Sequence, residues 1–155
     1  PLLNCNLEAA RFYPALLRPL QRLRVKRWDY YGFTTPERFF SFTLADLGYA
    51  GQAFVYTIDF ASGKYHEETV TIPLGRGVQL PRNSTEGESH YDNDRVRLAF
   101  QVTPAGRRVQ VHWPDFDGQP LSQRPKRVHH PGQPGIIAEE DKTAAIFIHN
   151  AFEVQ

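Results

Sequence analysis

The chain has 155 residues and a formal net charge of +1, which fits one domain and excludes binding to nucleic acid through a strongly basic overall charge. Its single cysteine, Cys5, excludes an internal disulfide and a cysteine-rich metal site. No apolar run reaches the roughly 18 residues of a membrane-spanning helix, and no signal peptide is recognisable, so we expect a cytoplasmic protein without an integral membrane segment.

The first predicted element is a short helical segment within residues 7–21. Leucine and alanine side chains are loosely spaced there for one face of a helix. Pro14 and Pro19 interrupt the pattern, because each removes an amide donor and clashes with the preceding turn. We therefore expect a short helix or a set of turns rather than a long helix.

Four strands are predicted next, over 23–33, 37–46, 52–60 and 64–72. They are rich in aromatic and β-branched residues, and Pro- and Gly-containing turns separate them. These connections are shorter than the dozen or so residues that a parallel crossover needs. The four segments therefore predict an antiparallel meander.

Residues 73–94 contain many Gly, Pro and polar residues and predict a long loop, with a short strand possible at 78–80. A hairpin follows, with strands at 95–102 and 108–113 in which apolar and polar residues alternate strictly. Trp113 shares a face with Val109 and Val111, so we expect all three to be buried.

The remainder is less regular. Residues 114–143 are rich in turn residues, and a short strand is possible near 126–130 or 135–138. Residues 144–154 predict a last strand. Together these segments predict an all-β fold, an antiparallel barrel or strongly curved sheet of roughly eight strands with a short N-terminal helical segment.

Several segments resemble the domain of unknown function 2804 family: Trp28–Tyr31, Phe39–Phe42, Ala45–Gly51 and Ile58–Gly63, with Asn4–Asn6 and Pro73–Gly77 in support. This family has no established activity. It is similar in general form to lipocalin-like proteins that include carotenoid hydratases and related cyclases, built from one or two antiparallel barrels.

The resemblance also implies a longer protein, because members of that family are usually about twice this length. The chain contains no Met and begins at Pro1. We therefore expect residues 1–155 to form one barrel-like domain, the N-terminal part of a two-barrel protein whose second barrel is a possible partner.

Aromatic side chains on neighbouring predicted strands provide the candidate ligand-binding residues: Trp28, Tyr30, Phe42, Phe54 and Tyr56. Rings of this kind supply apolar area, together with a few oriented polar groups, to a lipophilic small molecule. The alternative is a filled barrel core, which small barrels often have.

Two carboxylates, Asp46 and Asp59, lie at strand ends beside predicted turns. A carboxyl group in an aromatic mouth can act as a general acid when desolvation raises its pKa. Asp also stabilises turns by accepting hydrogen bonds from nearby backbone amides, and this is the role that the positions favour. No catalytic residue is assigned.

Other polar clusters favour ordinary surface roles. Adjacent histidines in a strand point to opposite faces, so His129 and His130 cannot share a metal ion, and His112 has no obvious further ligand near it. We therefore predict no metal and no cofactor. We interpret the group Glu86, Glu88 and His90 as part of a solvated loop. The basic run Arg18, Arg22, Arg24, Lys26 and Arg27 is interpreted as a charged strand edge. Cys5 is interpreted as an inert thiol.

Three hypotheses for function follow. The first is a lipocalin-like module that binds a small apolar ligand. The second is a hydratase, isomerase or cyclase that acts on a lipophilic substrate in such a barrel. The third is a structural or interaction domain with a filled core. A buried polar residue with a shifted pKa inside a cavity would favour the enzyme.

Overall fold

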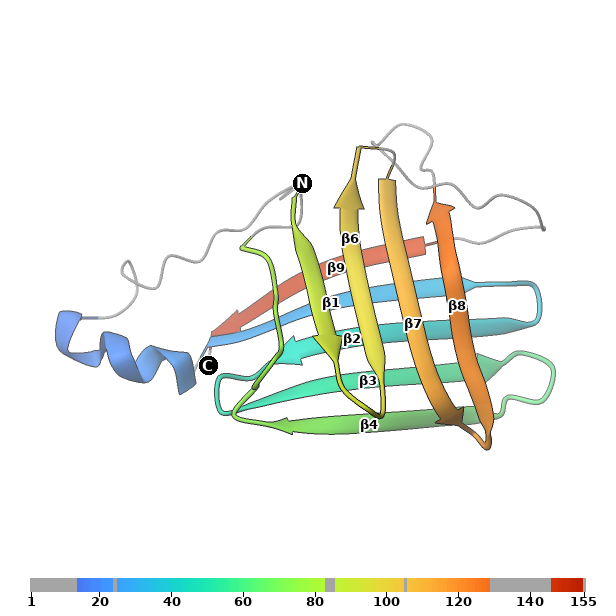
Figure 1. Ribbon diagram of the computed structural model, residues 1–155, viewed down its shortest axis with the longest axis horizontal. Helices are drawn as coiled ribbons and strands as arrows, with labels where there is room; N and C mark the ends of the chain where they lie inside the picture. Colours follow the sequence, from blue (N-terminus) through green and yellow to red (C-terminus); the bar gives the residue numbers. More distant parts are fainter. Residues whose placement is uncertain (1–13, 24, 83–85, 105, 129–145, 155) are drawn as a thin grey trace.

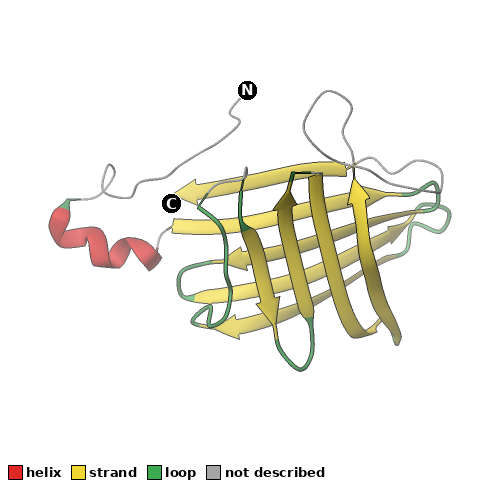
Figure 2. Ribbon diagram, turned by 45° about the horizontal axis from the view of Figure 1, so that its top comes forward, coloured by secondary structure: helices red, strands yellow, loops and turns green. Residues whose placement is uncertain are grey.

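The computed structural model describes residues 14–23, 25–82, 86–104, 106–128 and 146–154. Its strands form two antiparallel sheets that lie over one another as two layers, and the strands of one sheet run across those of the other (Figures 1 and 2). The expectation of an all-β antiparallel fold is confirmed. The described strands do not close into a barrel.

The larger sheet contains the four strands of the predicted meander, β1 (Val25–Thr34), β2 (Arg38–Asp46), β3 (Ala50–Asp59) and β4 (Tyr65–Pro73). The C-terminal strand β9 (Ile146–Val154) pairs with β1, which gives the order β4-β3-β2-β1-β9. Each predicted strand of this sheet therefore forms, within about two residues of the expected ends, as is usual for strand boundaries.

The second sheet has the order β5-β6-β7-β8. It contains the predicted hairpin, β6 (Arg97–Thr103) and β7 (Gly106–Phe116), and two edge strands, β5 (Glu88–Asp92) and β8 (Gln119–Val128). The prediction of a loop throughout 73–94 is wrong at β5. The suggested strand at 78–80 is present only as a single bridge between Gln79 and His90.

Strand β8 begins earlier than either segment suggested for this region. It contains Pro120 and Pro125 and pairs with β7 through two register shifts. Proline is tolerated in an edge strand because its missing amide faces away from the ladder. The suggested segment at 135–138 lies outside the described residues.

The helical prediction is borne out in part by the 3-10 helix η2 (Ala15–Leu23); residues 7–13 lie outside the described residues. Among the described residues, no helix has the length and apolar character that a membrane crossing requires.

Side chains from both sheets fill the space between the layers. The buried cluster includes Tyr31, Phe42, Leu44 and Val55 from the first sheet, and Leu98, Phe100, Val109, Val111 and Trp113 from the second. The predicted burial of Val109, Val111 and Trp113 is confirmed. Each strand of the larger sheet therefore has an inner face toward the second sheet and an outer face away from it.

Candidate functional site

The outer face of the larger sheet brings together four of the five predicted ligand-binding residues. Trp28 and Tyr30 of β1 lie opposite Ala45 and Thr43 of β2. Residues that face each other across a ladder project from the same side of the sheet. The next pairing places Phe54 opposite Thr43 and Tyr56 opposite Ser41, so the four aromatic residues share one face.

The fifth predicted residue, Phe42, lies on the inner face. It is 1% exposed and makes an edge-to-face contact with Phe33, with 5.5 Å between the ring centroids. Strand alternation places the side chain of Phe42 on the opposite side of the sheet from those of Ser41 and Thr43. It therefore belongs to the core and cannot line a surface with the other four.

We call the outer aromatic face the surface formed by Trp28, Tyr30, Phe39, Phe54, Tyr56 and Tyr65. The Oη atoms of Tyr30 and Tyr56 lie 3.2 Å apart and share a hydrogen bond. The ring of Tyr56 also packs against those of Phe39 and Tyr65, with centroid distances of 5.7 and 5.6 Å. These contacts hold the three rings and the Tyr30 hydroxyl against one another.

A glycine allows Phe39 to complete this surface. A Cβ atom at Gly32 would lie 3.0 Å from Cζ of Phe39 and 3.3 Å from Oη of Tyr30. The ring of Phe39 therefore lies over the bare backbone of β1. Any larger residue at position 32 would displace it.

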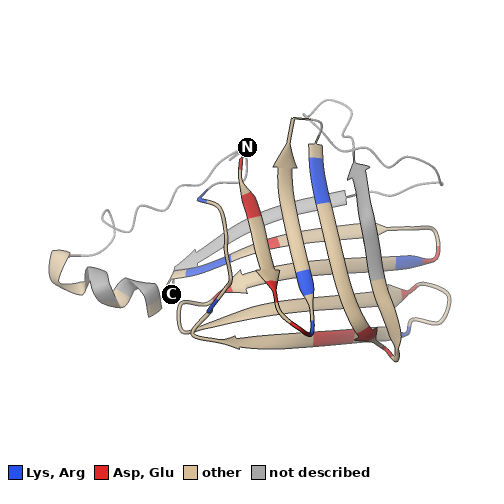
Figure 3. Cartoon of the chain, in the orientation of Figure 1, with Lys and Arg blue, Asp and Glu red and all other residues tan. Residues whose placement is uncertain are grey.

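Within β2 and β3, charged residues lie only at the ends of the strands, at Arg38, Asp46 and Asp59 (Figure 3). At one end of the outer aromatic face, Lys26 donates to the carbonyl oxygen of Leu47 at 3.0 Å, and its Nζ lies 4.2 Å from the centre of the Tyr49 ring. On the edge strand β4, Glu67 lies opposite Tyr56 and accepts a hydrogen bond from the hydroxyl of Tyr65.

A buried carboxyl group on the inner face was not anticipated from the sequence. Asp29 of β1 is 6% exposed and accepts a 2.5 Å hydrogen bond from the hydroxyl of Ser89 in β5. Its second oxygen, Oδ1, has no hydrogen-bond partner among the described residues. This pair joins the two sheets through a polar contact inside an otherwise apolar core.

Burial raises the pKa of Asp29 to about 6, although the hydrogen bond from Ser89 and the positive charge of Arg107 oppose the shift. Burial and the nearby Asp29 carboxylate also raise the pKa of Tyr31. Asp29 can therefore exchange a proton near neutral pH, as a general acid or base must.

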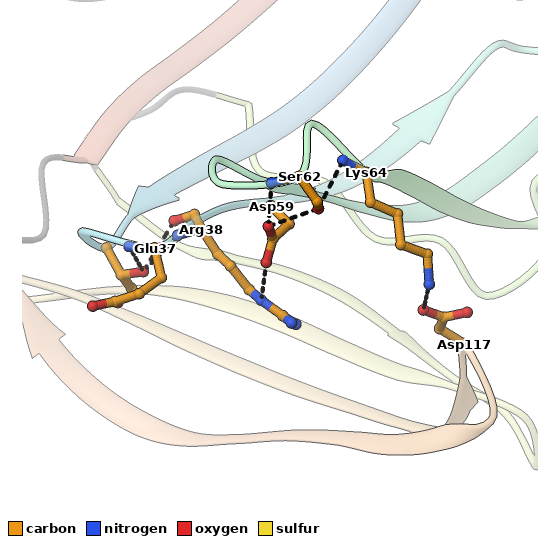
Figure 4. A network of polar contacts seen from close by, with 7 residues as sticks. Glu37, Arg38, Asp59, Ser62, Lys64 and Asp117 are labelled. Atoms are coloured by element: carbon orange, nitrogen blue, oxygen red, sulfur yellow. Dashed lines mark hydrogen bonds and ion pairs between the residues drawn. The ribbon is translucent and has the colours of Figure 1, made fainter.

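The predicted turn roles of Asp46 and Asp59 are confirmed. Oδ1 of Asp46 accepts from the amide of Gly48 at 2.8 Å. Oδ1 of Asp59 accepts from the amide and the hydroxyl of Ser62 at 2.9 and 2.8 Å, while Oδ2 pairs with Arg38 at 3.3 Å (Figure 4). These bonds, that from the Ser62 amide first, lower the pKa of Asp59.

A second polar cluster fastens β4 to the second sheet. Glu68 accepts hydrogen bonds from Nε1 of Trp113 at 2.9 Å and from the backbone amide of Asp117 at 2.8 Å, and its Oε1 lies 3.0 Å from Nε2 of His66. Burial opposes ionisation of Glu68, but the hydrogen bonds outweigh it and lower the pKa. The cluster continues through Asp117 to Lys64 (Figure 4).

The remaining candidates do not assemble into a site. Within the part of the chain that the structure describes, no three His, Cys, Asp or Glu side chains are placed to hold a metal ion. His112 is exposed on β7, and Glu88 and His90 lie in β5, with Glu86 just before it. Cys5, His129 and His130 lie outside the described residues.

Of the basic run, the structure describes the side chains of Lys26 and Arg27. Arg27 is half-buried and donates to the carbonyl oxygens of Leu80 and Pro81, both at 2.8 Å. It therefore anchors the segment before β5 rather than forming a free charged edge.

Comparison with known proteins gives one match. The family model described as domain of unknown function (DUF2804) matches residues 1–138. No curated protein and no solved structure matches the chain.

Proposed function

We propose that this chain, which belongs to the domain of unknown function 2804 family, binds a small, largely apolar molecule on its outer aromatic face. The observation that carries the proposal is the convergence of Trp28, Tyr30, Phe54 and Tyr56 on one surface of the larger sheet. Aromatic rings supply much of the contact area at binding surfaces, and their hydroxyl groups orient a bound molecule.

The exposure of these residues supports the proposal. All four are only partly buried, and Tyr65 beside them is 54% exposed. Contiguous apolar surface of this kind usually marks a site of interaction in a soluble domain. The resemblance to two-barrel proteins suggests what completes the site, because a second barrel over this face would enclose the ligand between the two domains.

The interior between the sheets is less suited to the same ligand. Large side chains from both layers, among them Phe42, Phe100, Leu44 and Leu98, are almost fully buried there. A ligand of any size would have to displace them. The proposed site is therefore the outer face rather than the inside of a barrel.

The test combines thermal shift with tryptophan fluorescence on the longest available form of the protein. A lipophilic library of fatty acids, isoprenoids and polyenes should contain a molecule that raises the melting temperature by mass action and changes the emission of Trp28. Trp113, the second tryptophan, lies in the core, so a Trp28→Phe variant should lose the emission change.

A matched pair of variants locates the ligand. Phe54→Ala removes a ring from the outer aromatic face and should weaken binding roughly tenfold. Phe60→Ala removes an exposed ring from the turn after β3 and should leave binding unchanged. Equal effects of the two substitutions, or a library without a binder, would refute the proposal.

Asp29 favours a second candidate, an enzyme of the hydratase, isomerase or cyclase type. A buried carboxyl group with a raised pKa has the property required of a general acid. Its side chain lies on the opposite face of β1 from those of Trp28 and Tyr30, so this candidate needs a substrate that enters between the sheets and displaces core side chains there. If a lipophilic substrate is turned over, Asp29→Asn should abolish turnover, whereas activity retained by that variant would exclude Asp29 as the acid.

A further inference from the structure

Two small polar residues of β2 form the floor of the outer aromatic face. Ser41 and Thr43 are 0% and 2% exposed, although they project from the side of the sheet that faces away from the core. Among the described residues, the hydroxyl of Thr43 has no hydrogen-bond partner, and that of Ser41 has only the Tyr56 hydroxyl beside it. Burying an unpaired hydroxyl is unfavourable, so such groups in a folded protein need an explanation.

The rings of the flanking strands bury this floor. Thr43 lies between Tyr30 and Phe54 in the ladder, and Ser41 lies opposite Tyr56. The Tyr30 and Tyr56 hydroxyls meet from β1 and β3, with β2 between them. The Tyr30 hydroxyl also lies beside Gly32, which pairs with Ser41. Three hydroxyl groups, those of Tyr30, Ser41 and Tyr56, therefore gather on an otherwise aromatic surface.

The phenol of Tyr56 is neutral at physiological pH. Burial and the hydrogen bond with Tyr30 raise the pKa of Tyr56 to about 12, with an opposing effect of the neighbouring Ser41 hydroxyl. A neutral phenol can both donate and accept a hydrogen bond. The weak 3.2 Å contact between the two phenols can be exchanged for bonds to a ligand.

We propose that Tyr30, Ser41 and Tyr56, which we call the hydroxyl cluster, recognise an uncharged oxygen function, a ketone or an alcohol, on an otherwise apolar ligand. The inference rests on the proposed function, because it assigns the polar end of the same ligand. The ligand's oxygen would accept from a tyrosine hydroxyl, and entry between the two phenols would bring it to the hydroxyl of Ser41, which lies in the same cross-strand row as Gly32 and Tyr56.

The charges around the cluster argue against an anionic ligand. The carboxylate of Glu67 lies opposite Tyr56 and would repel a second carboxylate. Lys26 is four residues from Tyr30, roughly 13 Å along an extended strand. Its Nζ is already engaged by the carbonyl oxygens of Leu23 and Leu47, so it does not provide a counter-charge at the cluster.

A matched ligand series tests the inference. Naphthalene, naphthylmethanol, acetonaphthone, naphthoate and naphthylmethylammonium share one flat skeleton and differ in the polar group. By isothermal titration calorimetry, the ketone and the alcohol should bind at least about tenfold more tightly than naphthalene, since a good hydrogen bond in a desolvated site is worth that factor.

Variants link the preference to the cluster. Tyr30→Phe with Tyr56→Phe should bring the affinity of the ketone down to that of naphthalene and leave naphthalene itself unaffected. Ser41→Ala should lower the affinity of the ketone alone. Tyr49→Phe, which removes a hydroxyl from the exposed β2–β3 turn, should change neither affinity.

The outcomes separate the two proposals. If naphthalene binds as tightly as the ketone, or if the carboxylate or the ammonium compound binds most tightly, the assignment of the hydroxyl cluster is wrong and the outer aromatic face remains a binding surface. If no compound binds, naphthalene included, the inference and the proposed function both fail.

Discussion

Replacing Asp29 with Asn should stabilise the protein at neutral pH. In the folded state the pKa of Asp29 is raised from 3.8 to about 6, chiefly by burial. Two pKa units correspond to about 3 kcal/mol of differential stability between the protonated and the ionised carboxyl group. Above pH 6 the buried carboxylate therefore lowers the stability of the folded protein. An uncharged amide of the same shape removes the free-energy cost of burying that charge.

The sign of the pH dependence follows from the raised pKa. Below the unfolded pKa of 3.8 the carboxyl group is protonated in both states, and the folded protein has the full benefit of a neutral group. As the pH rises from 3.8 to about 6, the unfolded chain loses its proton first and stability falls. Above that range the loss is complete and constant.

The assay is urea denaturation followed by circular dichroism between about pH 4 and pH 8, with the free energy of unfolding compared between wild type and Asp29→Asn. The variant should gain about 1–3 kcal/mol at the upper end, because the amide oxygen still accepts from Ser89. The gain should vanish toward pH 4. Asp115→Asn, an exposed carboxyl on β7, is the control and should show no such trend.

A different result would identify a different role for Asp29. If Asp29→Asn destabilises the protein at pH 8 by more than about 1 kcal/mol, the carboxylate is held as a favourable charge, with Arg107 as the source of the positive potential. A difference that does not change with pH would show that the pKa of Asp29 is close to its ordinary value. Either outcome removes the argument for an acid–base role.

Four further substitutions test the packing and the polar contacts. Trp113→Ala should cost about 3–5 kcal/mol in chemical denaturation, because it empties a buried position and removes the hydrogen bond to Glu68. Glu68→Gln should lower the free energy of unfolding by about 1 kcal/mol at neutral pH. The difference in unfolding free energy between variant and wild type should narrow as the pH falls below about 4.5, because the stability given by a lowered folded-state pKa is lost on acidification. Gly51→Ala should cost about 1–3 kcal/mol, as its Cβ would lie 2.7 Å from Cγ2 of Val78 and 3.1 Å from the backbone of Gly75; an unchanged midpoint would mean that this contact relaxes freely. Thr43→Val should raise the melting temperature, because it removes a buried hydroxyl without a partner, and a lower temperature would show that this hydroxyl is satisfied in solution.

Local pattern was sufficient for much of the fold. Strands β1 to β4 and the β6–β7 hairpin are all connected to a neighbour by a short turn, so the pairing partner follows from the chain itself. Alternation within 108–113 also identified the buried face, with Trp113 on it. In these segments, periodicity and turn chemistry agree, and such agreement makes sequence-based inference dependable.

The elements that escaped prediction depend on contacts distant in sequence. In β5, Ser89 and Tyr91 are buried and alternate with the polar residues Glu88, His90 and Asp92. The strand is defined by its pairing with β6 rather than by its composition. Strand β8 keeps its two prolines because it is an edge strand. The pairing of β9 with β1 joins the end of the chain to its first strand, and no local pattern indicates it.

The candidate site also depends on contacts distant in sequence, because these decide which face of each strand is buried. Alternation correctly placed Trp28 with Tyr30, and Phe54 with Tyr56, but it cannot show which face of a strand the other sheet covers. The predicted set also contains Phe42, which lies directly opposite Tyr31 on the inner face. Asp29 lies between Trp28 and Tyr30 in the sequence, so alternation places its carboxyl group on the opposite face of β1 from their rings. Its position two residues before Tyr31 does place a carboxyl group on the face that the core covers. A charged residue in register with buried aromatic residues is thus the sequence signal that would have found it.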